Sequence, residues 1–79
     1  MNKQVDVHLS KPDPGHSSVR ARWMICDNGM TVAEGEAEYD PESAVIDWSG
    51  NPPPAAYYVD VAFEIDRAVR RRQVRSNLT

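Results

Sequence analysis

The sequence has very little cysteine and no long apolar run. Cys26 is the only cysteine, which excludes an intramolecular disulfide framework and leaves too few thiolates for a zinc ribbon or a zinc finger. A single thiol suits a reducing compartment, so we expect a cytoplasmic protein. No apolar run approaches the roughly 20 residues that cross a bilayer, and residues 1–10 lack the continuous apolar stretch of a signal peptide. We therefore expect no membrane partner.

Residues suited to catalysis or metal binding are not clustered. His8, His16 and Cys26 are scattered over three expected elements, whereas the ligands of a metal site need short, regular spacing. Ser17 and Ser18 lie beside a histidine, but in a loop without the elbow and oxyanion signature of an activated serine. Glycine-rich phosphate-binding motifs are missing as well. We therefore expect no enzyme activity, no metal and no cofactor.

The length of the chain limits the size of its core. A chain of 79 residues corresponds to one domain, and a domain of this size buries only about 60% of its unfolded surface. A deep enclosed cavity is therefore not expected. We predict a single small domain over residues 1–79, with a frayed C-terminal tail from about residue 74.

Positive and negative charges are segregated along the chain. Residues 27–66 carry ten carboxylates and neither lysine nor arginine, although the net charge of the whole chain is only −3. Five arginines then follow within nine residues: Arg67, Arg70, Arg71, Arg72 and Arg75. A uniformly mixed surface does not give this arrangement, so a search for binding surfaces begins with these two segments.

Alternation of apolar and polar residues predicts strands in the first two thirds of the chain. The predicted strands cover residues 5–9, 19–25, 33–39 and 44–48. Asp27-Asn28-Gly29 is the strongest turn signal and predicts a hairpin between the second and third strands.

The register of this hairpin follows from side-chain parity, because a slip of one residue moves every side chain to the other face. A two-residue loop at Asn28-Gly29 would place Trp23 opposite Glu34 and set an apolar row against an acidic one. A three-residue loop, with Gly29 in the left-handed conformation, avoids this conflict. The predicted pairs are Trp23 with Ala33, Ala21 with Gly35, Val19 with Ala37, Arg22 with Glu34 and Arg20 with Glu36.

Residues 55–75 fit two periodicities. Strict alternation from Tyr57 to Ile65 would suit a strand, whereas a helix would bring six apolar residues onto one stripe: Tyr58, Val61, Ala62, Ile65, Ala68 and Val69. No glycine, proline or turn signal interrupts these 21 residues, which is too long for a strand and normal for a helix. We predict a helix.

The expected fold is therefore α+β, with an antiparallel sheet of about four strands and a C-terminal helix packed on one face. The alternative is an all-β five-stranded meander in which residues 56–65 form the fifth strand.

Six carboxylates form the first candidate binding surface: Glu34, Glu36, Glu38, Asp40, Glu42 and Asp47. The three glutamates would stand about 6.8 Å apart along one strand face. Such a row can engage a basic surface on a larger protein. Arginine partners across the hairpin would neutralise part of it.

The arginines form the alternative surface: Arg67, Arg70, Arg71, Arg72 and Arg75. They could contact nucleic-acid phosphates, or pair with acids of the same helix, such as Asp66 with Arg70 and Asp60 with Arg67.

The leading hypothesis is a small non-enzymatic module that binds a larger protein with a basic surface and blocks or adapts it. One alternative is a regulator that binds nucleic acid through the arginines, and we rank nucleic acid second to a protein as the expected partner. Another is a homodimeric structural subunit that buries Val59 and Phe63, so the chain is expected to be a monomer or a homodimer. In profile, being short and lacking a catalytic cluster, the chain resembles the small accessory proteins of phages and mobile elements, among them anti-CRISPR inhibitors.

Overall fold

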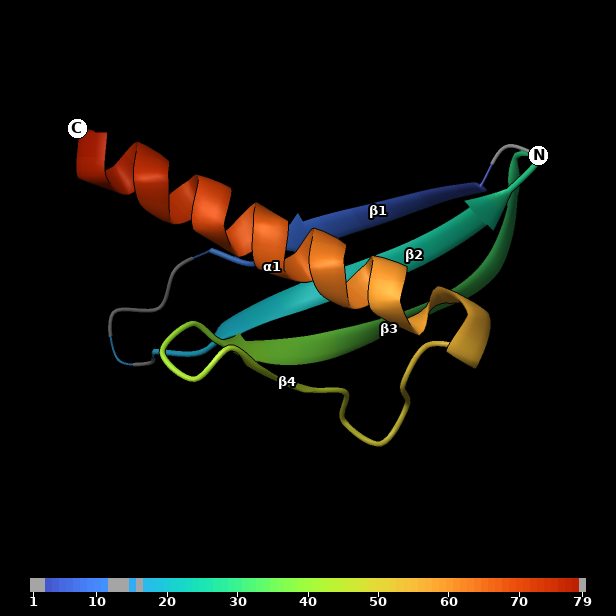
Figure 1. Cartoon of the computed structure of the whole chain (residues 1–79), viewed down its shortest axis with the longest axis horizontal. Helices are drawn as coiled ribbons and strands as arrows, with labels where there is room; N and C mark the ends of the chain where they lie inside the picture. Colours follow the sequence, from blue (N-terminus) through green and yellow to red (C-terminus); the bar gives the residue numbers. More distant parts are fainter. Residues whose placement is uncertain (1–2, 12–14, 16, 79) are drawn as a thin grey trace.

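The structure, a computed structural model, describes residues 3–11, 15 and 17–78, with side chains up to residue 73. It contains one antiparallel sheet of four strands in the order β1-β2-β3-β4, with one C-terminal helix in front of it (Figure 1). The elements are β1 (Lys3–Leu9), β2 (Val19–Asp27), β3 (Met30–Asp40), β4 (Val45–Asp47) and α1 (Ala55–Leu78). The predicted α+β fold is confirmed, and the five-stranded alternative is wrong because residues 56–65 are helical. The backbone of α1 continues past residue 74, and the predicted fraying of this tail stays a prediction.

The core lies between α1 and one face of the sheet. Its buried residues are Ala21, Trp23, Ile25, Ala37, Tyr39, Val61, Ile65 and Val69. Those on β2 and β3 are every second residue, and those on α1 are every fourth, so each element buries one face. Both predicted periodicities are therefore realised in the packing.

The predicted helix stripe is correct at its centre and wrong at one margin. Val61, Ile65 and Val69 are fully buried as predicted, but Tyr58 is 42% exposed. Its hydroxyl accepts a hydrogen bond from Nε1 of Trp48 at 2.9 Å, at the rim of the core. Tyr57, on the other margin, packs against the core instead. A polar hydroxyl explains this position, because a tyrosine at a rim can contact apolar groups and water at once.

The hairpin between β2 and β3 has a shorter loop than predicted. Asp27 pairs with Met30, and both residues between them have positive φ angles, 54° at Asn28 and 81° at Gly29. This is the two-residue turn whose twist matches that of the strands. The predicted left-handed Gly29 is confirmed, and the predicted three-residue loop is wrong.

A bulge in β3 then restores the parity. Cys26 pairs with Thr31 and Ile25 with Ala33, which leaves Val32 without a partner on β2. The extra residue that the parity argument required therefore lies inside the strand and not in the turn.

The bulge shifts every predicted pair by two residues. Observed pairs are Trp23 with Gly35, Ala21 with Ala37, Val19 with Tyr39, Arg22 with Glu36 and Arg20 with Glu38. A shift of two keeps each side chain on its predicted face. Trp23 lies over Gly35, where an added Cβ would be 2.6 Å from Cζ2 of the indole, so the predicted shared face of these residues is confirmed.

Candidate functional site

The sheet face turned away from α1 has no second layer of described residues above it. On this face, cross-strand pairing sets Asp6 beside Met24 and Glu34, and His8 beside Arg22 and Glu36. A third row joins Arg20, Glu38 and Asp47. We call this surface the open face. It exists because alternate residues of each strand are polar, which is how an antiparallel sheet meets water on one side.

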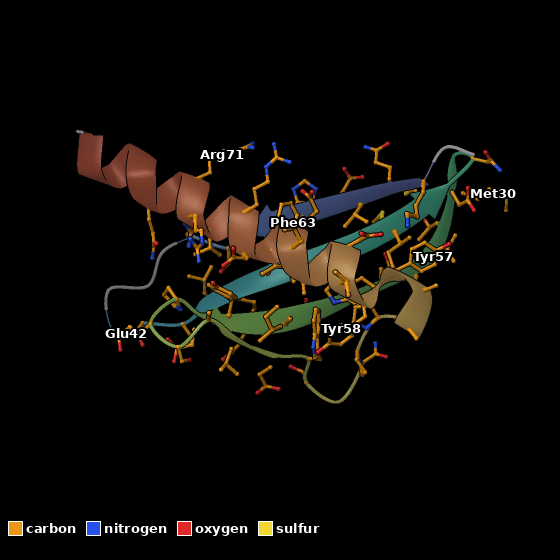
Figure 2. The ribbon with its side chains drawn as sticks, viewed as in Figure 1. Met30, Glu42, Tyr57, Tyr58, Phe63 and Arg71 are labelled. Carbon is orange, nitrogen blue, oxygen red and sulfur yellow. The ribbon has the colours of Figure 1, made fainter. Side chains whose placement is uncertain are left out.

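Five of the six predicted acidic residues come together on the open face: Glu34, Glu36, Glu38, Asp40 and Asp47. All are exposed except Asp40, which is half-buried. The sixth, Glu42, lies in the turn after β3 at the edge of the molecule (Figure 2). Its backbone N–H donates to Oδ1 of Asp40 at 3.0 Å, so the turn ties it to the same acidic region.

One carboxylate of this face was missed in the sequence. Asp6 alternates with Val5 and Val7 on β1, and the pairing through Met24 places it in the same row as Glu34. The alternation assigned Asp6 to the polar face of its strand. The order of the strands across the sheet, which the alternation does not specify, is what brings it into the acidic surface.

The positive charges on the open face do not balance the negative ones. Of the two arginines on this face, Arg20 lies closer to a carboxylate. Its Nη2 is 3.6 Å from Oε1 of Glu38, and both side chains are largely exposed. An exposed pair of this length contributes at most about 1 kcal/mol. Arg22 lies opposite Glu36, but none of the ion pairs between described residues joins them. The face therefore keeps an excess of negative charge.

The arginines of α1 are mostly engaged within the molecule. Arg67 lies 3.6 Å from a carboxylate oxygen of Glu64, and Nε of Arg70 lies 3.0 Å from Oδ2 of Asp66. Hydrogen bonding to Asp66 raises the pKa of Arg70 above its ordinary value. Arg72 donates to the carbonyl oxygen of Ser10.

Arg71 and Arg75 are the remaining arginines of α1. Arg71 is exposed, and no ion pair between described residues includes it. The side chain of Arg75 lies outside the described residues. At most described positions, the guanidinium groups of the predicted basic cluster therefore have partners within the molecule.

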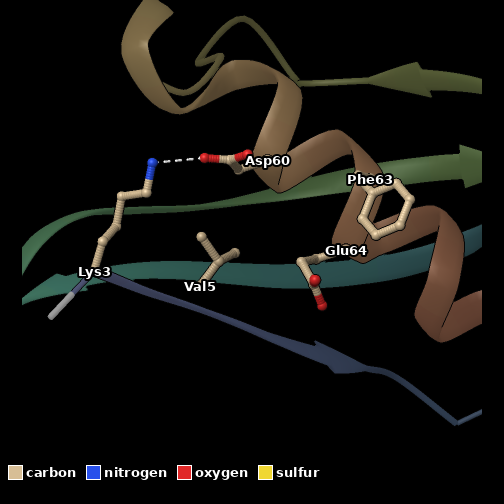
Figure 3. Close-up of a pocket in the computed structure, with 5 residues that line it drawn as sticks. All are labelled: Lys3, Val5, Asp60, Phe63 and Glu64. Carbon is tan, nitrogen blue, oxygen red and sulfur yellow. Dashed lines mark hydrogen bonds and ion pairs between the residues drawn. The ribbon is translucent and has the colours of Figure 1, made fainter.

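A surface pocket of about 310 Å³ lies between β1 and α1 (Figure 3). Nζ of Lys3 donates to Oδ2 of Asp60 at 2.7 Å across it, and this hydrogen bond raises the pKa of Lys3. The lysine also lies 5.0 Å from the ring centroid of Tyr57. Val5 and Phe63 complete the apolar side of the pocket. The two opposite charges of the pocket are therefore paired with each other.

Among the described residues, no group of three or more histidine, cysteine, aspartate or glutamate side chains could hold a metal ion. The described part of the chain contains no helix that is long and apolar enough to cross a membrane. No protein-family model, curated protein or solved structure matches the chain.

Proposed function

We propose that the protein is a small non-enzymatic module that binds a basic surface of a larger protein through its open face. The observation that carries this proposal is the gathering of Glu34, Glu36, Glu38, Asp40 and Asp47 on one uncovered sheet face. Carboxylates presented by a sheet are held at fixed spacing, so they can match a row of basic groups without first being ordered. Their field also speeds the encounter with a positively charged partner.

The engagement of the arginines supports the acidic face over the basic one. Arg67, Arg70 and Arg72 each have a partner within the molecule, and a nucleic-acid phosphate would have to compete with those partners. Glu34 and Glu36, by contrast, belong to none of the ion pairs between described residues. They are available to a partner's lysines and arginines.

A module of this kind acts by occupying a surface. A chain of 79 residues that presents an acidic sheet face can fill a basic groove that otherwise receives a phosphate backbone, and so block it. We place this activity in the cytoplasm, and we propose an inhibitor of the type that phages and mobile elements carry. The small size and the profile of the chain support that assignment.

Nucleic-acid binding through α1 is the second candidate. The observation in its favour is that Arg67, Arg70 and Arg71 are all exposed on the C-terminal half of α1. A gel shift that weakens steeply with added salt would support it, because phosphate contacts release counterions.

Affinity capture with two matched variants separates these candidates. The first variant, Glu34→Lys/Glu36→Lys/Glu38→Lys, changes only the open face, and the second, Arg67→Ala/Arg70→Ala/Arg71→Ala, changes only the helix. Each is used as bait in lysate of the source organism, with circular dichroism to confirm folding. Captured proteins are identified by mass spectrometry and purified for measurement of Kd.

We expect the wild type and the arginine variant to capture the same protein, and the open-face variant to lose it. The Kd of the purified partner should rise at least about tenfold for the open-face variant, which corresponds to about 1.4 kcal/mol. Normal binding by a folded open-face variant, with loss of binding by the arginine variant, would overturn the proposal in favour of the basic surface.

A further inference from the structure

The side of α1 turned away from the sheet carries an apolar ridge. Val59 is 76% exposed and Phe63 is 61% exposed, and Ala56 is exposed as well. These residues are three and four positions apart, so they form one line along the helix. In Figure 2 the Phe63 side chain is drawn over the front of α1, with the sheet behind the helix. An outer helix face is normally polar, and no described residue covers this one.

The charges of α1 are divided between its two halves. The first half contains Asp60, Glu64 and Asp66 and no basic residue. The second half contains Arg67, Arg70, Arg71, Arg72 and Arg75 and no acidic residue. A second helix of the same sequence, lying antiparallel, would set each acidic half beside a basic half. The peptide dipoles of the two helices would also oppose each other favourably.

We propose that α1 binds α1 of a second copy of this chain, antiparallel, about a two-fold axis at Phe63. In such a pair the same surface is used on both subunits. Asp60 lies three residues before Phe63 and Arg67 lies four residues after it. They are seven residues apart, about two helical turns, and so lie on the same flank of the ridge. Asp60 of each copy therefore meets Arg67 of the other, and the pair occurs twice.

The apolar residues fit the same arrangement. The two Phe63 rings meet at the axis, and the second copy's Arg67 lies at the same height along the helix as Val59. The aliphatic part of an arginine side chain covers apolar surface while its charged end remains in water. Arg67 is 54% exposed and pairs with Glu64 at 3.6 Å, so binding a second copy exchanges one carboxylate partner for another. Asp60 likewise exchanges the ammonium group of Lys3 for a guanidinium group.

The size of the contact sets the strength to be expected. α1 has 24 residues and is about 36 Å long at 1.5 Å per residue. One helix face of this length buries less than the roughly 800 Å² per partner of a standard interface. The dimer is therefore a weak one that forms in the micromolar range. It leaves the open face of each copy free, because α1 and the open face lie on opposite sides of the sheet, and so it presents two acidic faces at once.

Sedimentation equilibrium from about 5 to 500 µM tests this dimer with charge-reversed chains. The average mass of the wild type should rise from 8.9 kDa towards twice that value. Asp60→Arg and Arg67→Asp should each weaken association at least about tenfold, because like charges then face each other twice. An equimolar mixture of the two variants should recover the dimer as a heterodimer, since each reversed charge then meets its opposite.

The mixture separates the proposed contact from other effects of the substitutions. Asp60→Arg also removes the hydrogen bond from Lys3, but a chain changed only at Arg67 could not restore that intramolecular bond. Glu36→Lys, on the open face, is the control and should leave the mass unchanged. Phe63→Ser should abolish the dimer while circular dichroism shows an intact fold.

Three results would overturn the inference. The first is a wild type that keeps the monomer mass at every concentration. This holds also if the Phe63→Ser variant fails to capture a different protein that the wild type captures, because the ridge would then bind that protein and not a second copy. The second is a dimer that persists in Phe63→Ser, because the copies then meet elsewhere. The third is a mixture of two folded, monomeric reversed chains that fails to associate, which would exclude the antiparallel pairing of Asp60 with Arg67.

Discussion

Tyr39 on β3 donates a hydrogen bond to the carboxylate of Asp66 on α1, 27 residues further along the chain. Tyr39 is only 2% exposed, whereas Asp66 lies at the rim and also accepts a hydrogen bond from Nε of Arg70 at 3.1 Å. The bond from Tyr39 is the main cause that lowers the pKa of Asp66. Burial, and then the bond itself, raise the pKa of Tyr39. One polar contact thus fixes the helix against the third strand.

Replacing Tyr39 with phenylalanine should lower the free energy of unfolding by about 1 to 2 kcal/mol. This lies at or just below the low end for a hydrogen bond to a charged group, because the side chain of Asp66 is 32% exposed and water replaces part of the contact. Urea unfolding followed by tryptophan fluorescence measures the change. Tyr58→Phe, which alters the more exposed contact with Trp48, is the control. An equal loss in the two variants would contradict a special role for Tyr39.

The same contact should limit stability at both ends of the pH range. The folded pKa of Asp66 lies below its ordinary value of 3.8, so its contribution is complete above that value and is lost as the pH falls through the folded pKa. The folded pKa of Tyr39 lies above its ordinary value of 10.0. Its contribution is therefore complete below pH 10 and is lost as the pH rises through the folded pKa.

Urea titrations from pH 2 to pH 11 measure both effects. Asp66→Asn should lose less stability than the wild type between pH 4 and pH 2, because it has no carboxylate to protonate at this position. Identical acid profiles for the wild type and Asp66→Asn would show that other carboxylates control acid unfolding.

Gly35→Ala should destabilise the fold by about 1 to 3 kcal/mol, the usual cost of overpacking a core. Its Cβ would lie 2.6 Å from Cζ2 of Trp23, and the indole is buried, so it cannot move away freely. The emission spectrum of the protein should also change, because Trp23 contacts Trp48 edge to face with centroids 6.3 Å apart. Glu36→Ala, on the opposite face of the same strand, is the matched control. A stable Gly35→Ala variant with an unchanged spectrum would show that the indole is not held against this glycine.

The sequence predicted which face each strand residue occupies better than it predicted the strand pairing. Alternation is a local property, so parity on β2 and β3 was correct. The register depended on where one extra residue lies, and a turn and a bulge satisfy parity equally well. The pairing of Trp23 with Gly35 was the available signal, because a large aromatic ring commonly covers a glycine on the neighbouring strand.

The candidate site was predicted in part for a similar reason. Alternation was enough to place Glu34, Glu36 and Glu38 on one face. Asp6 joined them only through the order of the strands, which is set by long-range packing. The internal partners of Arg72 and Tyr39 were also not predicted, because Ser10 and Asp66 lie far from them in the sequence.

Ile65→Ala should lower the free energy of unfolding by about 2 to 5 kcal/mol, because it removes buried contacts and leaves a cavity. Ile65 is fully buried between α1 and the sheet. Val59→Ala is the matched control on the same helix, at a site that is 76% exposed. There the change should be within about 0.5 kcal/mol and favourable, because alanine has the higher helix propensity. Urea unfolding at submicromolar concentration measures both variants as monomers. Similar losses at the two sites would contradict the assigned inner and outer faces of α1.

Salt should slow the association of the open face with its partner much more than it speeds dissociation. Long-range attraction between exposed charges is screened beyond about 8 Å at physiological ionic strength, whereas ion pairs already formed are screened less. Stopped-flow measurements with the captured and purified partner at 50 and 300 mM salt give both rate constants. Glu34→Lys/Glu36→Lys should lower the association rate at 50 mM salt and flatten its dependence on salt, because the attracting field is then weaker. Arg67→Ala/Arg70→Ala should leave the dependence as steep as in the wild type or make it steeper, since the net negative charge increases. An association rate that is equally insensitive to salt in all three proteins would mean that contacts other than the carboxylates of the open face guide the encounter.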